Sequence, residues 1–214
     1  MNQTDQPSPA TASPSQSRAP ADRQASGRWK LFAILGVCAF PLIASYFTYY
    51  VIKPEARTNY GDFIDYMVHP IPADLSTTTL DGTAMTLKDL EGKWIMLTVD
   101  GGACAEACSK KLYDIRQLRV AQGRERDRIE RVWLITDKVP LETQVIREFD
   151  GTQMLRAQAD AVAKWLPAEV GATAADHIYL IDPLGRLMMR FPKDRDPNLM
   201  KKDLGKLLKA SSIG

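Results

Sequence analysis

The chain has 214 residues, 45% of them hydrophobic and 25% charged, which is typical of one globular domain with short appendages. The 28 basic and 26 acidic residues leave a net charge of +2, which excludes the strong positive field of a typical nucleic-acid-binding protein. Three cysteines are too few for a small domain that is held together by several disulfides.

The N-terminal segment differs in composition from the rest of the chain. Residues 1–28 contain four prolines among Ser, Thr, Gln and Ala, with few large apolar side chains to form a core, so we predict a disordered cytoplasmic tail. Residues 31–52 carry no charge, and 22 residues exceed the roughly 20 that cross a hydrocarbon core. We predict a transmembrane helix over residues 29–52, kinked at Pro41. Cys38 lies within this helix, and we expect its side chain to be buried and chemically inert.

The charges around this segment predict its orientation. Four basic residues precede it: Arg18, Arg23, Arg28 and Lys30. A thinner set of charges follows it: Lys53, Glu55 and Arg57. The positive-inside rule therefore predicts a single-pass inner-membrane protein with a cytoplasmic N-terminus and a periplasmic, or otherwise extracytoplasmic, C-terminal domain. The alternative is a cleaved signal peptide, but the apolar segment is longer than usual and ends without an Ala-x-Ala site.

Residues 53–75 are predicted to be a linker and residues 76–214 the folded domain. Alternating stretches around Asp81-Gly82 predict a hairpin, and residues 93–99 a buried strand. Downstream, the apolar spacing predicts the following elements: a helix over 109–120, a strand over 131–136, helices over 141–149 and 154–166, strands over 177–181 and 186–191 joined by a turn at 182–185, and a helix over 198–208. This order predicts an α/β fold with a mixed sheet flanked by helices.

Cys104 and Cys108 lie at the junction between the strand over 93–99 and the helix over 109–120. A helix N-terminus favours thiolate over thiol, which supports nucleophilic and metal-binding chemistry. Thiolates at i and i+4 share a helix face and are soft ligands that select Cu(I), and the same spacing also permits a disulfide. The alternative is that both cysteines are small apolar residues at the start of a helix.

The chain resembles the Sco (SenC-type) proteins, thioredoxin-like proteins that help to load copper into cytochrome c oxidase. The resemblance rests on LDGxxxTLxDLxGKW over residues 80–94, on the CxxxC pair, on YLIDPLGR over residues 179–186 and on the N-terminal anchor. It implies a thioredoxin-like fold, with Cys104 and Cys108 as a redox pair that also binds Cu(I). The family's third copper ligand is a histidine, and Asp176-His177 matches the family's dipeptide a few residues closer to Tyr179 than is usual.

The chain departs from the Sco pattern in one further respect, because Ala105 and Ser109 replace the prolines that usually follow the two cysteines. The only other histidine, His69, is a weaker ligand candidate. Asp100 is either a proton acceptor near the thiols or a polar strand end, and Glu106 either raises the pKa of the thiols or faces solvent.

The leading hypothesis is a membrane-anchored accessory protein of cytochrome c oxidase assembly, held in the membrane by residues 31–52. It would deliver Cu(I) to an oxidase subunit or another respiratory client, or exchange thiols and disulfides with it. Such a protein is a copper chaperone or exchange protein rather than a turnover enzyme. The alternative is a tethered thioredoxin-like binding module whose cysteines form only a structural disulfide.

Overall fold

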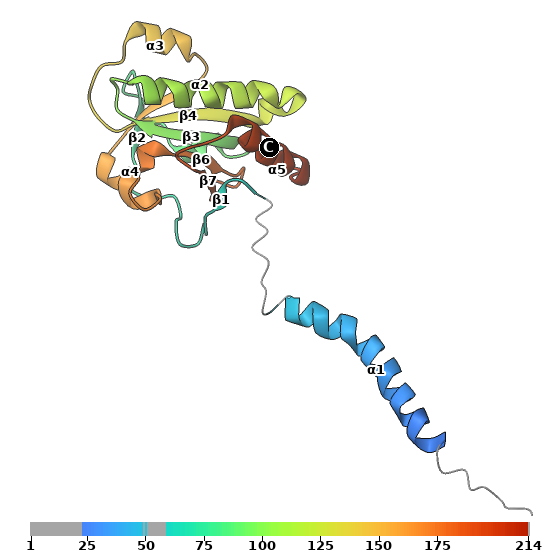
Figure 1. Cartoon of the computed structure of the whole chain (residues 1–214). Coiled ribbons are helices and arrows are strands. Elements are labelled where there is room, and N and C mark those ends of the chain that lie inside the picture. The colour runs from blue at the N-terminus through green and yellow to red at the C-terminus, as the bar shows by residue number, and fades with distance from the viewer. Residues whose placement is uncertain (1–22, 49, 51–58, 214) are drawn as a thin grey trace, which may run out of the picture. The chain divides into compact units, whose positions relative to one another are not determined.

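The computed structural model describes residues 23–48, 50 and 59–213. The chain forms two compact units, Met1–Ala56 and Arg57–Gly214, and each is described separately (Figure 1). The predicted disorder of the N-terminal tail falls largely on residues 1–22, which lie outside the described residues.

The first unit contains one long helix, α1 (Arg23–Phe47), which continues through Pro41. Its segment Arg28–Phe47 is long and apolar enough to cross a membrane, which fits the predicted single transmembrane helix. The helix begins before the predicted start at residue 29, and residues 49, 51 and 52, near the predicted end, lie outside the described residues. Cys38 is exposed rather than buried, because the other described residues cover none of this apolar segment.

The second unit is built on a seven-stranded sheet in the order β1-β7-β6-β3-β4-β5-β2 (Figure 1). Its three parallel strands are β3 (Trp94–Asp100), β4 (Ile129–Ile135) and β5 (Gln153–Ala157). Four strands pair with their neighbours in antiparallel fashion: β6 (Ile178–Ile181), β7 (Leu187–Phe191), β1 (Asp62–Phe63) and β2 (Thr77–Thr79). The predicted mixed sheet is confirmed.

Helices cover both faces of this sheet. One face packs against α2 (Glu106–Ala121) and α5 (Pro197–Ala210), with the short α3 (Thr143–Glu148) on the same side (Figure 1). The other face packs against α4 (Ala159–Trp165). Three short 3₁₀ helices complete the domain: η2 (Leu87–Leu90), η3 (Gly123–Arg128) and η4 (Ala174–Asp176).

The central strand β3 shows why the sheet is buried on both sides. Trp94 and Met96 point into the core beneath α2 and α5, whereas Ile95, Leu97 and Val99 point into the core beneath α4. Successive side chains of a strand face opposite ways, so a strand between two helical layers is a continuous apolar run. The direction of β3 carries its last residue, Asp100, to the edge where the cysteine loop begins.

The predicted helix over residues 154–166 is wrong in its first part. Residues 153–157 form strand β5, and the helix α4 begins only at Ala159. Met154 and Leu155 are buried, and β5 is hydrogen-bonded to β4 on one side and to β2 on the other. Pairing with two neighbouring strands outweighs the local helical spacing, because propensity is a weak determinant beside tertiary contacts.

The folded unit also starts earlier than the predicted boundary at residue 76. Strand β1 falls within the predicted linker and pairs with β7, with Asp62 opposite Arg190. Arg190 Nη2 also bonds the Asp62 carboxylate at 3.0 Å. Residues 59–75 of the predicted linker belong to the same compact unit as the sheet, and residues 53–58 lie outside the described residues.

Candidate redox site

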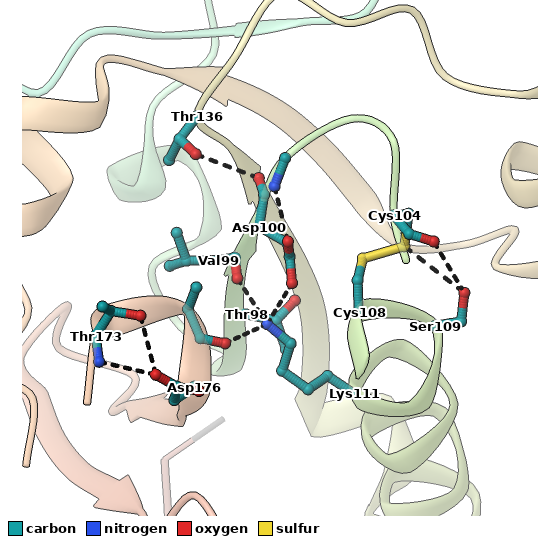
Figure 2. Close-up of polar contacts among 12 residues, drawn as sticks. Thr98, Val99, Asp100, Cys104, Cys108, Ser109, Lys111, Thr136, Thr173 and Asp176 are labelled. Carbon is teal, nitrogen blue, oxygen red and sulfur yellow. Dashed lines mark hydrogen bonds and ion pairs between the residues drawn. A yellow bond between two sulfur atoms is a disulfide. The ribbon is translucent and has the colours of Figure 1, made fainter. Parts of the chain in front are cut away.

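The two cysteines lie where the sequence predicts, between the end of β3 and the first turn of α2 (Figure 2). They form a disulfide with a Cα–Cα separation of 5.0 Å. Cys104 precedes the helix and is 8% exposed, whereas Cys108 is inside the first turn and only 2% exposed. An incoming nucleophile or client disulfide therefore reaches Cys104 more easily than Cys108.

The backbone at Cys104 is strained. Its φ of +41° is the only positive φ of a non-glycine residue in the described part of the chain. Side chains other than glycine rarely occupy this left-handed region, and such outliers concentrate at functional sites. Ser109 Oγ donates to the Cys104 carbonyl oxygen at 3.4 Å and lies 3.8 Å from Cys104 Sγ. Ser109 thus contacts the more exposed cysteine.

A carboxylate on the neighbouring loop fixes the path of the cysteine loop. Asp137 Oδ1 accepts hydrogen bonds from Gly102 N at 2.9 Å and from Val139 N at 3.1 Å. Arg156 of β5 holds the same neighbouring loop by donating to the carbonyl oxygens of Asp137 and Val139 at 2.7 and 3.0 Å. Three segments distant in sequence therefore determine where Cys104 sits.

Lys111 is buried beneath the cysteine loop and ties it to η4. Its ammonium group donates to Asp100 Oδ2 at 2.7 Å, to the Val99 carbonyl oxygen at 2.8 Å and to the Ala175 carbonyl oxygen (Figure 2). Burial lowers the pKa of Lys111, and the hydrogen bond to Asp100 opposes this shift. The Asp100 carboxylate is thus one half of an ion pair at the strand end.

Beside the cysteines, the surface forms an open groove of about 510 Å³. Its walls come from the first turns of α2, from η4 and from the loop after β7: Ala107, Lys110, Lys111, Ala175, Asp176, Lys193, Asp194 and Arg195. Asp176 accepts hydrogen bonds from Thr173 and pairs with Lys193 at 3.1 Å. These bonds, chiefly the one from the Thr173 backbone, lower the pKa of Asp176 to about 2, so its carboxylate is charged at neutral pH.

His177 is fully buried, and both of its ring nitrogens have partners. Nδ1 lies 3.0 Å from the Phe191 carbonyl oxygen, and Nε2 accepts a hydrogen bond from Glu169 N at 3.3 Å. This pattern requires the neutral tautomer with its proton on Nδ1. In this arrangement His177 joins the loop after α4 to the end of β7.

The described residues contain no group of three or more His, Cys, Asp or Glu side chains arranged to hold a metal ion. With Cys104 and Cys108 in a disulfide and His177 bonded on both nitrogens, the predicted copper ligands are engaged elsewhere. The role of His177 as a copper ligand stays a prediction. It is tested on the protein whose Cys104–Cys108 disulfide has been reduced. His69 instead contributes its carbonyl oxygen, which accepts from Trp165 Nε1 at 3.3 Å.

We expect the stability of the domain to fall as the pH drops below 6.5, because burial lowers the pKa of His177 from that value. In this range the unfolded chain binds more protons than the folded protein, so the free energy of unfolding decreases as the pH falls toward the folded pKa. Urea denaturation of the full chain in detergent between about pH 7.5 and 5.5 measures the slope. His177→Asn should be less stable but should flatten the slope, and an unchanged slope would assign it to other groups.

Residues 94–211 match the model of the family described as transmembrane-like, thioredoxin-like, C-terminal domain. The matched range is more than half of the chain. The chain belongs to this family. Among curated proteins, no sequence matches the chain.

Solved structures of Sco proteins share the fold of this family member. The copper-bound ScoI of Arabidopsis thaliana is 17% identical with a TM-score of 0.52, over 66% of this chain and 99% of that one. Yeast Sco1 is 15% identical with a TM-score of 0.51, over 66% and 97% of the two chains. Its copper-bound form is 14% identical with a TM-score of 0.50, over 73% and 96%. The predicted thioredoxin-like fold and the likeness to Sco proteins are confirmed at this level.

Sequence reasoning missed two residues that organise the site of this thioredoxin-like protein. Lys111 is three residues after Cys108 and next to Leu112, within the apolar stripe of α2, and a lysine in such a stripe signals a buried partner. Asp137 follows the buried strand β4 and Asp100 ends the buried strand β3, and parallel strands end at the same edge of a sheet. That shared edge is the signal that could have placed Asp137 beside the cysteine loop.

Proposed function

We propose that this protein is a membrane-tethered thiol–disulfide exchange protein of the Sco type that acts outside the cytoplasm on a client of cytochrome c oxidase assembly. The observation that carries this proposal is the Cys104–Cys108 disulfide at the exposed edge of a thioredoxin-like sheet, with one cysteine more accessible than the other. A pair that can be both bonded and reached by another chain is suited to exchange.

The exchange proceeds in two displacement steps. In the reduced protein, the Cys104 thiolate attacks one sulfur of a client disulfide, forming a mixed disulfide and releasing the client's other sulfur as a thiolate. The Cys108 thiolate then attacks Cys104 Sγ, which releases the second client thiolate and restores the Cys104–Cys108 disulfide. Two electrons pass from the pair to the client, and an external dithiol reductant must return them.

The start of α2 supplies the electrostatics for these steps. Cys108 lies in the first turn of a helix, where unpaired backbone N–H groups favour negative charge on sulfur. Glu106 is exposed in the same turn and opposes this effect. The groove along the first turns of α2 offers space for an extended client segment.

The apolar helix α1 supports the tethered location. It is long enough to span a bilayer, and the basic residues that precede it favour a cytoplasmic N-terminus. The domain then lies on the side where disulfides persist. An intact mass equal to the full chain in membranes tests the tether, because removal of a signal peptide would shorten the protein.

Cu(I) delivery is the second candidate function, with the metal as cargo rather than a resident cofactor. It is supported by the copper-bound ScoI and Sco1 structures, whose fold this chain shares. Once reduced, Cys104 and Cys108 offer two adjacent soft thiolates that suit Cu(I). A third ligand from His177 would require that its ring give up one of two hydrogen bonds.

The test uses the full chain in detergent, in a Cys38→Ser background, with glutathione disulfide as the probe. We expect the reduced protein to return to the intramolecular disulfide, Cys108→Ser to accumulate a glutathione adduct on Cys104, and Cys104→Ser to react about 10-fold more slowly, because Cys108 is more buried. An absence of adduct, or a reduction potential far below about −300 mV, would indicate a static structural bridge instead.

Anaerobic Cu(I) titration of the same proteins separates the two functions. One tightly bound Cu(I) per chain, lost in both cysteine variants, is the result that copper delivery requires. Retention of copper by His177→Asn would leave His177 outside the metal site. Wild-type protein that exchanges thiols but binds no stoichiometric Cu(I) would exclude copper delivery and leave exchange as the function.

A further inference from the structure

A groove of about 570 Å³ between α5 and the C-terminal end of α2 is lined with lysines. Its walls are formed by Gln122, Asn198, Lys201, Lys202, Gly205, Lys206 and Lys209. Among the described residues that line it, none is acidic. Four lysines in one groove are a concentrated positive charge on a chain whose net charge is only +2.

The lysines occupy the face of α5 that the domain core does not use. Met200, Leu204 and Leu208 are buried against the sheet, while Lys201, Lys202 and Lys209 are exposed. No ion pair joins these three lysines to any described residue. Lys206 differs, since its ammonium group lies 3.3 Å from Asp203 Oδ1. The charge of the groove is therefore left for a partner outside the domain.

Residues 60 and 61, near the start of the second unit, are hydrogen-bonded to α5 and to the residue before it. Asp203 is buried on α5, and its Oδ2 accepts hydrogen bonds from Tyr60 N at 2.5 Å and from Gly61 N at 3.0 Å. Just before the start of α5, the backbone N–H of Asp196 donates a hydrogen bond to the Tyr60 hydroxyl oxygen at 2.8 Å. The first residues of the domain are thus fastened to the helix that carries the lysines.

This attachment limits how far α5 can lie from the bilayer. Tyr60 follows Phe47, the last residue of α1, by 13 residues, and a fully extended chain of that length spans at most about 45 Å. If α1 crosses the membrane, the lysine groove stays within reach of the bilayer surface. A short tether raises the effective concentration of the groove at the headgroups, so weak individual contacts add up.

We propose that the lysine groove of α5 docks on anionic lipid headgroups at the bilayer surface from which α1 emerges. The proposal rests on the uncleaved anchor of the proposed function. Lysine near an anionic surface binds as a compact point charge, and the sum over several lysines sets the affinity.

Docking through the lysine groove determines which way Cys104 and Cys108 face relative to the bilayer. Gln122, at the groove, and Cys108, at the disulfide, are at opposite ends of α2, and the 13 helical steps from Cys108 to Ala121 rise about 20 Å. A domain that rests on its lysine groove therefore holds the cysteines away from the headgroups. The client site presented to such a pair is one that projects from the membrane.

The test places a donor fluorophore at Asn198→Cys, in a Cys38→Ser background with the disulfide intact, and an acceptor on lipid headgroups. The full chain is reconstituted in nanodiscs of phosphatidylcholine alone or with about 30% phosphatidylglycerol. We expect strong energy transfer only with phosphatidylglycerol, and its loss in about 1 M salt through screening. Lys201→Gln/Lys202→Gln/Lys209→Gln should lower the ratio of docked to undocked protein about 100-fold.

The matched control removes three other exposed positive charges, in Lys88→Gln/Arg147→Gln/Lys164→Gln, and should dock like the wild type. Equal transfer in the two lipids, or equal loss in the two triple variants, would overturn the proposal and leave an acidic protein as the partner of the groove. Intact mass separates the causes: a shortened chain means that the anchor has failed, whereas a full-length chain without lipid-dependent transfer means that only the docking has failed.

Discussion

Replacing Lys111 with methionine is expected to lower the free energy of unfolding by about 3 kcal/mol. Methionine keeps most of the apolar stem but removes three donated hydrogen bonds, to Asp100, Val99 and Ala175. The Asp100 carboxylate then remains partly buried without its counter-charge, and the carbonyl oxygens of Val99 and Ala175 lose a donor. Urea denaturation of the full chain in detergent, at neutral pH with the disulfide intact, measures the loss.

Two further variants make this result specific. Lys110→Met is the matched control, because the Lys110 side chain is 61% exposed and its partner Asp114 keeps a second ion pair, with Arg195 at 3.2 Å, so we expect a loss below about 1 kcal/mol. In Lys111→Met/Asp100→Asn, the stranded charge is gone, and part of the lost stability should return. Equal losses for Lys110→Met and Lys111→Met would show that the buried ion pair contributes nothing of its own.

The central elements of the fold could be predicted because local pattern and tertiary environment agree there. The strand over residues 93–99 is apolar throughout, as expected of a strand buried on both faces, and it is β3 in the structure. The turn at residues 182–185 carries Pro183 and Gly185, whose φ of +76° confirms that glycine is required there. Asp182 adds a side-chain bond to Arg186 N that tightens the turn.

Strands that depend on hydrogen bonds to segments distant in sequence could not be predicted from local pattern. Strands β1 and β2 have two and three residues, too few for a periodic signal, and each exists because a neighbouring strand supplies its hydrogen bonds. In the same way, residues 153–157 show helical spacing but lie between two strands. Local pattern cannot reveal which of two compatible structures the rest of the sheet selects.

In the candidate site, too, local pattern predicts some residues and only the folded structure reveals the others. Cys104 and Cys108 could be placed at a helix start because the flanking strand and helix are both strongly patterned. The contacts that hold them, from Asp137 and Lys111, come from side chains brought together only by folding. The sequence leaves two roles for Asp100, a proton acceptor near the thiols or a polar strand end. The ion pair with Lys111 favours the second role, because it holds the carboxylate in a network of polar contacts at the end of β3.

Gly102→Ala should lower the free energy of unfolding by about 2–3 kcal/mol and displace the loop that carries Cys104. A Cβ atom at this position would lie 2.3 Å from the Val139 carbonyl oxygen, far inside contact distance. The obstacle is a backbone atom, and Arg156 holds that same carbonyl oxygen at 3.0 Å, so the neighbouring loop cannot yield without losing a hydrogen bond. Thermal or urea unfolding of the full chain, together with the reduction potential of the cysteine pair, measures both effects.

Two other glycines show whether the clash, rather than the loss of a glycine, causes the change. At Gly101 the obstructing atom is the end of the Asp137 side chain, 2.5 Å from the added Cβ, so Gly101→Ala should recover stability when combined with Asp137→Ala, whereas Gly102→Ala should not. In α5, Gly205→Ala meets only Gln122 Oε1 at 3.4 Å and should stabilise the helix by about 0.5–1 kcal/mol. If Gly102→Ala instead left stability and potential unchanged, the close packing of the cysteine loop on residues 137–139 could not be what positions Cys104, and its strained φ would need another source.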